Sequence, residues 1–92
     1  MKTLRVIISG QVQGVWYRAW TVQEAKSRGL SGWVRNRAEG SVEALFSGPA
    51  EDVAAMIEAC RSGPPSARVS GLEIFEGENE TVAAGFVQRQ TV

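Results

Sequence analysis

The order in which two hydrophobic patterns follow one another restricts the fold of this chain more than any other feature of its sequence. Apolar, β-branched runs indicate strands, and apolar residues at steps of three and four indicate helices. The patterns predict strands at 4–8, 30–37, 41–47 and 67–76, helices at 17–28 and between Pro49 and Gly63-Pro64-Pro65, a polar loop at 77–81, and a short strand at 85–89. The predicted order is therefore β-α-β-β-α-β, with one short strand added at the end.

This order predicts an α+β domain of the ferredoxin-like kind. Two split β-α-β units build a four-stranded antiparallel sheet with both helices on one face, and a short fifth strand can be added to it. The 92 residues suffice for a single domain, 1–92, and are too few for two. Within the strand at 41–47, Val42, Ala44 and Phe46 are expected to be buried and the residues between them mostly exposed. The element order by itself indicates no function.

Both helices have a face that is expected to enter the core. In the first helix, Trp20 and Ala25 are expected to be buried, and Gly29 is placed to end the helix in the left-handed conformation. In the second helix, four apolar residues recur at helical spacing: Val53, Met56, Ile57 and Cys60.

Histidine is absent, and Cys60 is the only cysteine. These two counts exclude catalysis by histidine, a Ser-His-Asp triad, an intrachain disulfide, and a zinc or iron–sulfur site built by this chain. No metal or other cofactor is expected. The ten basic and ten acidic residues give a formal charge of zero, which argues against a general nucleic-acid binder.

The apolar run near the N-terminus, at 4–8, is too short for the core of a signal peptide or for a membrane span. The default expectation is therefore a cytoplasmic protein that does not bind a membrane. The balanced charge also favours a monomer.

The segment Gly10–Arg18 joins the first strand to the first helix and is the leading candidate for a binding site. Gly10 and Gly14 permit conformations that turn successive N–H groups inward into an anion-binding nest, to which the helix adds the positive end of its dipole. Arg18 can then close over the oxyanion with two parallel N–H···O contacts. Taken alone, these residues also fit a plain turn with a solvated arginine, because the segment is neither a Gly-x-Gly-x-x-Gly motif nor a Walker loop.

Asn36 is the second candidate. In the predicted arrangement the strand at 30–37 and the loop at Gly10–Arg18 can share one end of the sheet, which would bring Asn36 near the oxyanion. An amide side chain carries a donor and an acceptor, so it can hold and orient a water molecule. The competing interpretation is a turn residue at the end of a strand. Trp33 is expected in the core or in edge packing rather than at a ligand.

Two spaced motifs resemble those of the acylphosphatase family. Gly10–Arg18 matches the first signature, Gly-x-Val-Gln-Gly-Val-x-Phe/Tyr-Arg, at every fixed position. Gly32–Asn36 and then Gly40–Ala44 match the second, Gly-Trp-Val-Arg/Lys-Asn followed by Gly-x-Val-x-Ala. The chain departs from the family at Glu39, where Asp is usual, and at Gln88, where the last strand commonly has an apolar residue.

The resemblance covers essentially the whole chain and implies hydrolysis of acyl phosphates to a carboxylate and inorganic phosphate. A carboxylate leaving group needs no proton, because its conjugate acid has a pKa of about 4, so the absence of histidine is no obstacle. The expected catalytic residues are Arg18 and Asn36. The substrate phosphate is expected to contact Arg18 and the backbone of the loop, formed by Gln13, Gly14, Val15, Trp16, Tyr17 and Arg18.

Two other functions compete with the enzyme. A non-catalytic module that binds phosphate or an acyl phosphate fits the same loop, and the family resemblance includes such domains within larger carbamoyl-transfer proteins. An RNA-binding module shares the element order but needs exposed aromatic residues in a basic setting, whereas the central strands offer Trp33 and Phe46 in a chain of zero net charge. The expected ligands are therefore a small acyl phosphate and inorganic phosphate, without nucleic acid.

Overall fold

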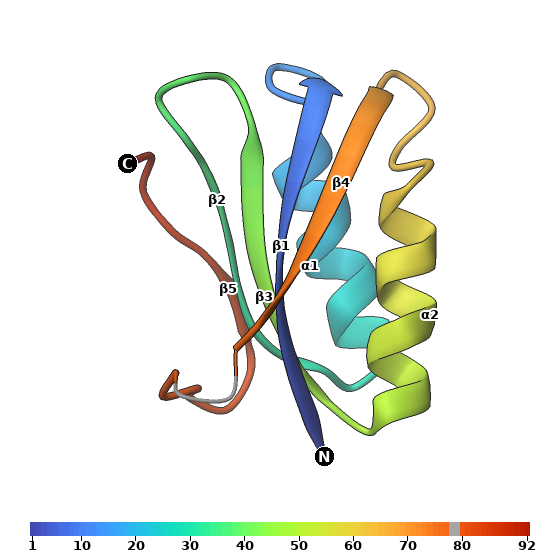
Figure 1. The fold of residues 1–92 in the computed structure, drawn as a ribbon, viewed down its shortest axis with the longest axis vertical. Coiled ribbons are helices and arrows are strands. Elements are labelled where there is room, and N and C mark those ends of the chain that lie inside the picture. The colour runs from blue at the N-terminus through green and yellow to red at the C-terminus, as the bar shows by residue number, and fades with distance from the viewer. Residues whose placement is uncertain (78–79) are drawn as a thin grey trace.

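The computed structural model describes residues 1–77 and 80–92. Within these ranges two helices pack against one face of a five-stranded sheet, as the ferredoxin-like prediction requires (Figure 1). The elements are β1 (Lys2–Gln11), α1 (Tyr17–Ser27), β2 (Ser31–Asn36), β3 (Val42–Gly48), α2 (Ala50–Cys60), β4 (Arg68–Glu76) and β5 (Phe86–Gln88). Part of the predicted loop at 77–81 lies outside the described residues. Neither helix in the described ranges combines the length and the apolar character that a membrane span needs.

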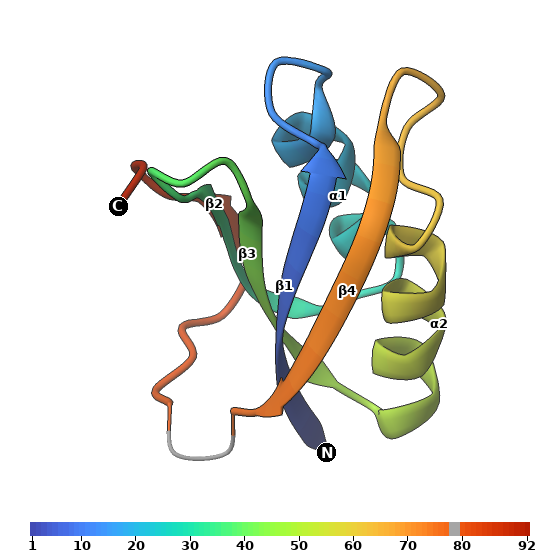
Figure 2. The ribbon, with the colours of Figure 1, turned by 45° about the horizontal axis from the view of Figure 1, so that its top comes forward.

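The strands lie in the order β4-β1-β3-β2-β5. β1 pairs antiparallel with β3 and β4, and β2 pairs antiparallel with β3, which confirms the four-stranded antiparallel sheet. The short β5 joins the edge of β2 in the parallel direction, so the complete sheet is mixed. The direction follows from the topology, because β4 ends at the end of the sheet where β2 begins, and a strand that starts there runs alongside β2 (Figure 2).

Both helices lie on one side of the sheet (Figure 2), and the buried hydrophobic side chains form the core between them and the sheet. The prediction for α2 is confirmed, since its buried residues are Val53, Met56, Ile57 and Cys60. In α1, Ala25 is fully buried, and Trp20 is partly buried and packs against the core. Gly29 follows the C-cap residue Arg28 and has a φ of 70°, as predicted for the residue that ends this helix. Trp33 is 4% exposed, which agrees with its expected packing role.

The predicted exposure of one face of β3 is wrong. Every residue of β3 is buried, and on the face away from the helices these are Glu43, Leu45 and Ser47. Arg5 on β1 and Arg35 on β2 each donate a hydrogen bond to a Glu43 carboxylate oxygen at 2.8 Å. Because β3 has strands on both sides, long side chains from those neighbours cover it. Alternation within one strand does not reveal this cover.

The end of β1 carries the irregularity that opens the loop to α1. The register between β1 and β4 shifts between Ser9 and Gly10. Gly10 has a φ of 121°, and a Cβ atom there would lie 2.2 Å from the carbonyl oxygen of Arg68. Only glycine fits so close an approach of two backbones. The bulge therefore fixes the point at which the chain leaves β1 for the candidate site.

Candidate active site

The loop from Val12 to Trp16 connects β1 to α1 at one end of the sheet (Figure 2). Val12 is buried and anchors the start of the loop. Gly14 and Trp16 both take the left-handed conformation, with φ of 74° and 67°. A left-handed backbone at a bulky residue costs about 1–3 kcal/mol and is concentrated at ligand sites.

The N-terminus of α1 is left without a side-chain cap. Trp16 precedes the helix, and no side chain within residues 1–77 and 80–92 forms a capping hydrogen bond there. The first N–H groups of a helix have no partners inside the helix, and they lie at the positive end of its dipole. This end of α1 is therefore suited to receive an anion.

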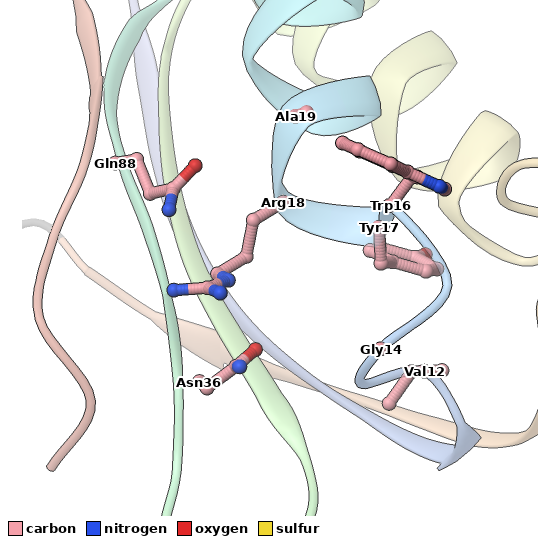
Figure 3. Close-up of a pocket in the computed structure, with 8 residues that line it drawn as sticks. All are labelled: Val12, Gly14, Trp16, Tyr17, Arg18, Ala19, Asn36 and Gln88. Atoms are coloured by element: carbon pink, nitrogen blue, oxygen red, sulfur yellow. The ribbon is translucent and has the colours of Figure 1, made fainter.

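Arg18 lies in the first turn of α1, and its side chain extends toward β2 (Figure 3). Among the residues that the structure describes, Arg18 forms no ion pair, whereas Arg5 and Arg35 share Glu43. The guanidinium can therefore offer its fork of N–H donors to a bound oxyanion.

Asn36 is the last residue of β2, where it pairs with Val42. Its side-chain oxygen, Oδ1, is buried and accepts no hydrogen bond from the described part of the chain. A buried acceptor without a partner costs about 1–3 kcal/mol, so it is suited to a water molecule or a ligand donor.

These parts line one pocket of about 350 Å³. Figure 3 shows the guanidinium of Arg18 between the side-chain amides of Asn36 and Gln88. The lining residues are Val12, Gly14, Trp16, Tyr17, Arg18, Ala19, Asn36 and Gln88. The pocket thus combines a helix N-terminus, a guanidinium and an amide oxygen that have no side-chain partners in the described part of the chain. Together they suit a tetrahedral oxyanion and a water molecule.

A family model for acylphosphatases matches residues 4–88 of the chain. The chain belongs to the acylphosphatase family. The acylphosphatase of Rhodospirillum rubrum is 69% identical over 74 residues, which cover 80% of this chain and 81% of that protein. The acylphosphatase of Azorhizobium caulinodans is 58% identical over 90 residues, covering 98% and 97% of the two chains. The crystal structure of acylphosphatase from Bacillus subtilis matches with a TM-score of 0.91 at 35% identity, over 97% of this chain and 99% of that one.

The resemblance inferred from the two motifs is therefore confirmed, and this member of the acylphosphatase family is an enzyme that hydrolyses acyl phosphates. The relatives named acylphosphatase match it over most of their own length. No comparison favours the non-catalytic module.

Two residues of the predicted phosphate loop do not line the pocket of this acylphosphatase. The Nε2 group of Gln13 donates to the carbonyl oxygens of Arg37 and Ser41, both at 2.8 Å. Val15 is partly buried and packs against the core. Gln13 therefore ties the loop to the β2–β3 turn, next to Asn36, while Gly14, Trp16, Tyr17 and Arg18 line the pocket.

The side chain of Tyr17 is directed into the core. Its hydroxyl donates to the carbonyl oxygen of Cys60 on α2, and the side chain is 1% exposed. Burial, with a smaller contribution from Cys60, raises the pKa of Tyr17 far above its usual range. Burial also raises the pKa of the Cys60 thiol to about 12. Both groups stay protonated near neutral pH, so neither is suited to act as a base or a nucleophile.

Sequence reasoning did not place Gln88 at the site. In the sequence, Gln88 is only a polar residue where the family commonly has an apolar one. Gln88 pairs with Val34 in the parallel ladder between β5 and β2, and from there its side chain lines the pocket. The departure from the family pattern at Gln88 was visible in the sequence. The position of its side chain, however, depends on which strand β5 joins.

Metal binding by the protein's own side chains depends on how these side chains are arranged in the fold. The described residues contain no group of three or more His, Cys, Asp or Glu side chains arranged to hold a metal ion.

Proposed function

We propose that the pocket binds the phosphoryl group of an acyl phosphate and hydrolyses it by in-line attack of a water molecule on phosphorus. The backbone N–H groups of the Gly14–Arg18 loop and the Arg18 guanidinium hold the phosphoryl oxygens. Asn36 holds the attacking water. The observation that carries this proposal is that Arg18 and the buried, unpaired Oδ1 of Asn36 lie at one pocket beside an uncapped helix N-terminus.

The proposed roles agree with the chemistry of the substrate. An acyl phosphate releases a carboxylate, which departs without protonation because its conjugate acid has a pKa of about 4. The reaction therefore needs no general acid, and its barrier can be lowered by positioning and charge stabilisation. A phosphoryl oxygen of the substrate accepts the proton of the water in this proposal, which requires no metal and no protein base.

An isotope experiment tests where the water attacks. Acetyl phosphate is hydrolysed by the enzyme in ¹⁸O-labelled water, and both products are analysed by mass spectrometry. Attack on phosphorus places the label in inorganic phosphate and leaves acetate unlabelled. Label in acetate would show attack on the carbonyl carbon and would contradict the role given to Asn36.

We also infer that the protein, as one domain spanning 1–92, acts as a monomer in the cytoplasm on small molecules. The zero formal charge does not favour nucleic acid or an anionic membrane as a partner. The buried free thiol of Cys60 is compatible with a reducing compartment. Sedimentation of the purified enzyme at working concentration tests the monomer.

A further inference from the structure

A shallow groove continues from the pocket along the surface between α1 and β5. It has a volume of about 470 Å³. Its lining residues are Ala19, Val22, Gln23, Lys26, Phe86, Val87 and Gln88. Ala19 and Gln88 line the phosphate pocket as well, so the two spaces meet at these side chains.

One wall of the groove is a single face of α1. Counted from Ala19, the other lining residues of α1 stand three, four and seven positions later: Val22, Gln23 and Lys26. These spacings place all four along one side of the helix. Seven residues span about 10 Å of helix at 1.5 Å per residue. Opposite them, β5 contributes the buried ring of Phe86 and the half-exposed side chain of Val87. Apart from Gln23, the middle of the groove is therefore apolar, and Lys26 makes its far end positively charged.

Lys26 is the charged group at that end. It lies in the last turn of α1 and is exposed. Within residues 1–77 and 80–92 it forms no ion pair. Helical side chains lean toward the N-terminus of their helix, which here is the direction of the phosphate pocket. The ammonium group of Lys26 can therefore approach a ligand that extends from that pocket.

In-line displacement decides where the rest of the substrate must go. The attacking water and the leaving oxygen lie on opposite sides of phosphorus. Figure 3 shows Asn36 on one side of the Arg18 guanidinium and Ala19 and Gln88 on the other. With water at Asn36, the acyl group leaves the pocket past Ala19 and Gln88, where the groove begins.

We propose that this groove binds the acyl chain and that Lys26 selects acyl phosphates whose chain ends in a second anionic group, the monophosphoryl anhydrides of dicarboxylic acids. This inference rests on the proposed function, because it takes the position of the leaving group from it. Gln88 offers an amide to the acyl carbonyl at the entrance, and the apolar middle of the groove receives the methylene carbons.

The test compares two six-carbon substrates that differ only at the far end of the chain, adipoyl phosphate and hexanoyl phosphate. The ratio of their kcat/KM values is measured for the wild type, Lys26→Met, Lys26→Glu, Lys26→Arg and the matched control Lys2→Met. Lys2 lies at the start of β1, at the end of the sheet away from the phosphate pocket, and does not line the groove. We expect Lys26→Met to lower the adipoyl-to-hexanoyl ratio by about 1.5- to 5-fold, the range of an exposed ion pair.

The variants separate charge from structure. Lys26→Glu should lower the ratio further, Lys26→Arg should retain it, and Lys2→Met should leave it at the wild-type value. The loss should appear mainly in KM and should fade at about 1 M salt, where charges are screened within about 3 Å. An unchanged ratio in both Lys26→Met and Lys26→Glu would overturn the proposal that Lys26 selects acyl chains bound in this groove. Failure of the wild type to hydrolyse either substrate, with hydrolysis of acetyl phosphate retained, would also overturn the groove, whereas failure on acetyl phosphate as well would overturn the proposed function.

Discussion

At the scale of single residues, the arginines of this protein fall into two groups. Arg5 and Arg35 both donate to Glu43, so each forms an ion pair with the same carboxylate on the sheet. Arg18 faces a pocket and has no ion-pair partner in the described part of the chain. An arginine that is paired with a carboxylate stabilises the fold, whereas an arginine without such a partner in a pocket attracts an oxyanion.

Replacing Arg18 by alanine should therefore abolish most of the activity. We expect kcat/KM for acetyl phosphate to fall by about 10³-fold or more, since an arginine that stabilises a transferring phosphoryl group contributes about 10³–10⁵. Inorganic phosphate should also inhibit the variant more weakly. Phosphate release and product inhibition give both quantities.

Arg61→Ala is the matched control, because Arg61 is exposed on the surface at the end of α2 and forms an ion pair with the exposed Glu58. It should retain wild-type activity. Unchanged phosphate affinity in Arg18→Ala would contradict the assignment of Arg18 to the phosphoryl oxygens.

Replacing Asn36 by alanine should separate turnover from binding. The variant loses the group that holds the water but keeps the loop and Arg18, so we expect kcat to fall by about 10²-fold, as for a misplaced reactant. The inhibition constant of inorganic phosphate should change little. An equal loss of turnover and phosphate affinity would make Asn36 a binding or structural residue instead.

At the scale of elements, two connections hold the halves of the site in place. Gln13 ties the loop before α1 to the β2–β3 turn. The segment after β5 continues along β2: the N–H of Arg89 donates to Val34, and the N–H of Val92 donates to the carbonyl oxygen of Asn36 at 3.2 Å. Arg18 and Asn36 come from different elements, so these hydrogen bonds help to set the geometry between them.

The bulge at the end of β1 gives a prediction for stability. In Gly10→Ala the new methyl group would overlap the Arg68 carbonyl at a φ that suits only glycine. We expect a loss of at least about 1–3 kcal/mol in the free energy of unfolding, measured in urea. Gly71→Ala is the control, because Gly71 lies on β4 next to this bulge with open space around its Cβ position. It should be neutral within about 0.5–1 kcal/mol. Equal effects of the two substitutions would argue against a close backbone approach at Gly10.

At the scale of the whole molecule, the contact between α1 and α2 makes stability depend on alkaline pH. Tyr17 and Cys60 are buried together, and the pKa of each is raised, that of Cys60 to about 12. In the unfolded chain the pKa of cysteine is about 8.5 and that of tyrosine is about 10. Below those pKa values the folded and unfolded states both keep the two protons, so the contribution of Tyr17 and Cys60 to stability does not change with pH. Above them the unfolded state loses protons that the folded state keeps, so stability falls as pH rises.

Urea unfolding at intervals from pH 7 to 11 measures this effect. The free energy of unfolding should fall above about pH 9, by up to about 1.4 kcal/mol per pH unit for each group. Cys60→Ala should flatten the fall between about pH 9 and 10, where cysteine alone titrates in the unfolded chain. The same slope in Cys60→Ala and the wild type would show that this pair does not govern alkaline unfolding.

Much of the fold could be predicted because local rules decided it. The helical spacing of Val53, Met56, Ile57 and Cys60 indicated the buried face of α2, and all four are buried. The exposure of the other face of β3 was mispredicted, because Arg5 and Arg35 reach it from strands that are distant in sequence.

The sequence by itself determined the family, the order of the elements and the loop that carries Arg18, because two motifs at fixed spacing and two hydrophobic periods are local properties. Only the tertiary structure decided that Asn36 and Gln88 lie on either side of Arg18, and that Gln13 is a tie rather than part of the pocket wall. The physical reason is that strand pairing brings β1, β2 and β5 together at one end of the sheet. Which side chains meet there depends on register and direction, which no short stretch of sequence contains.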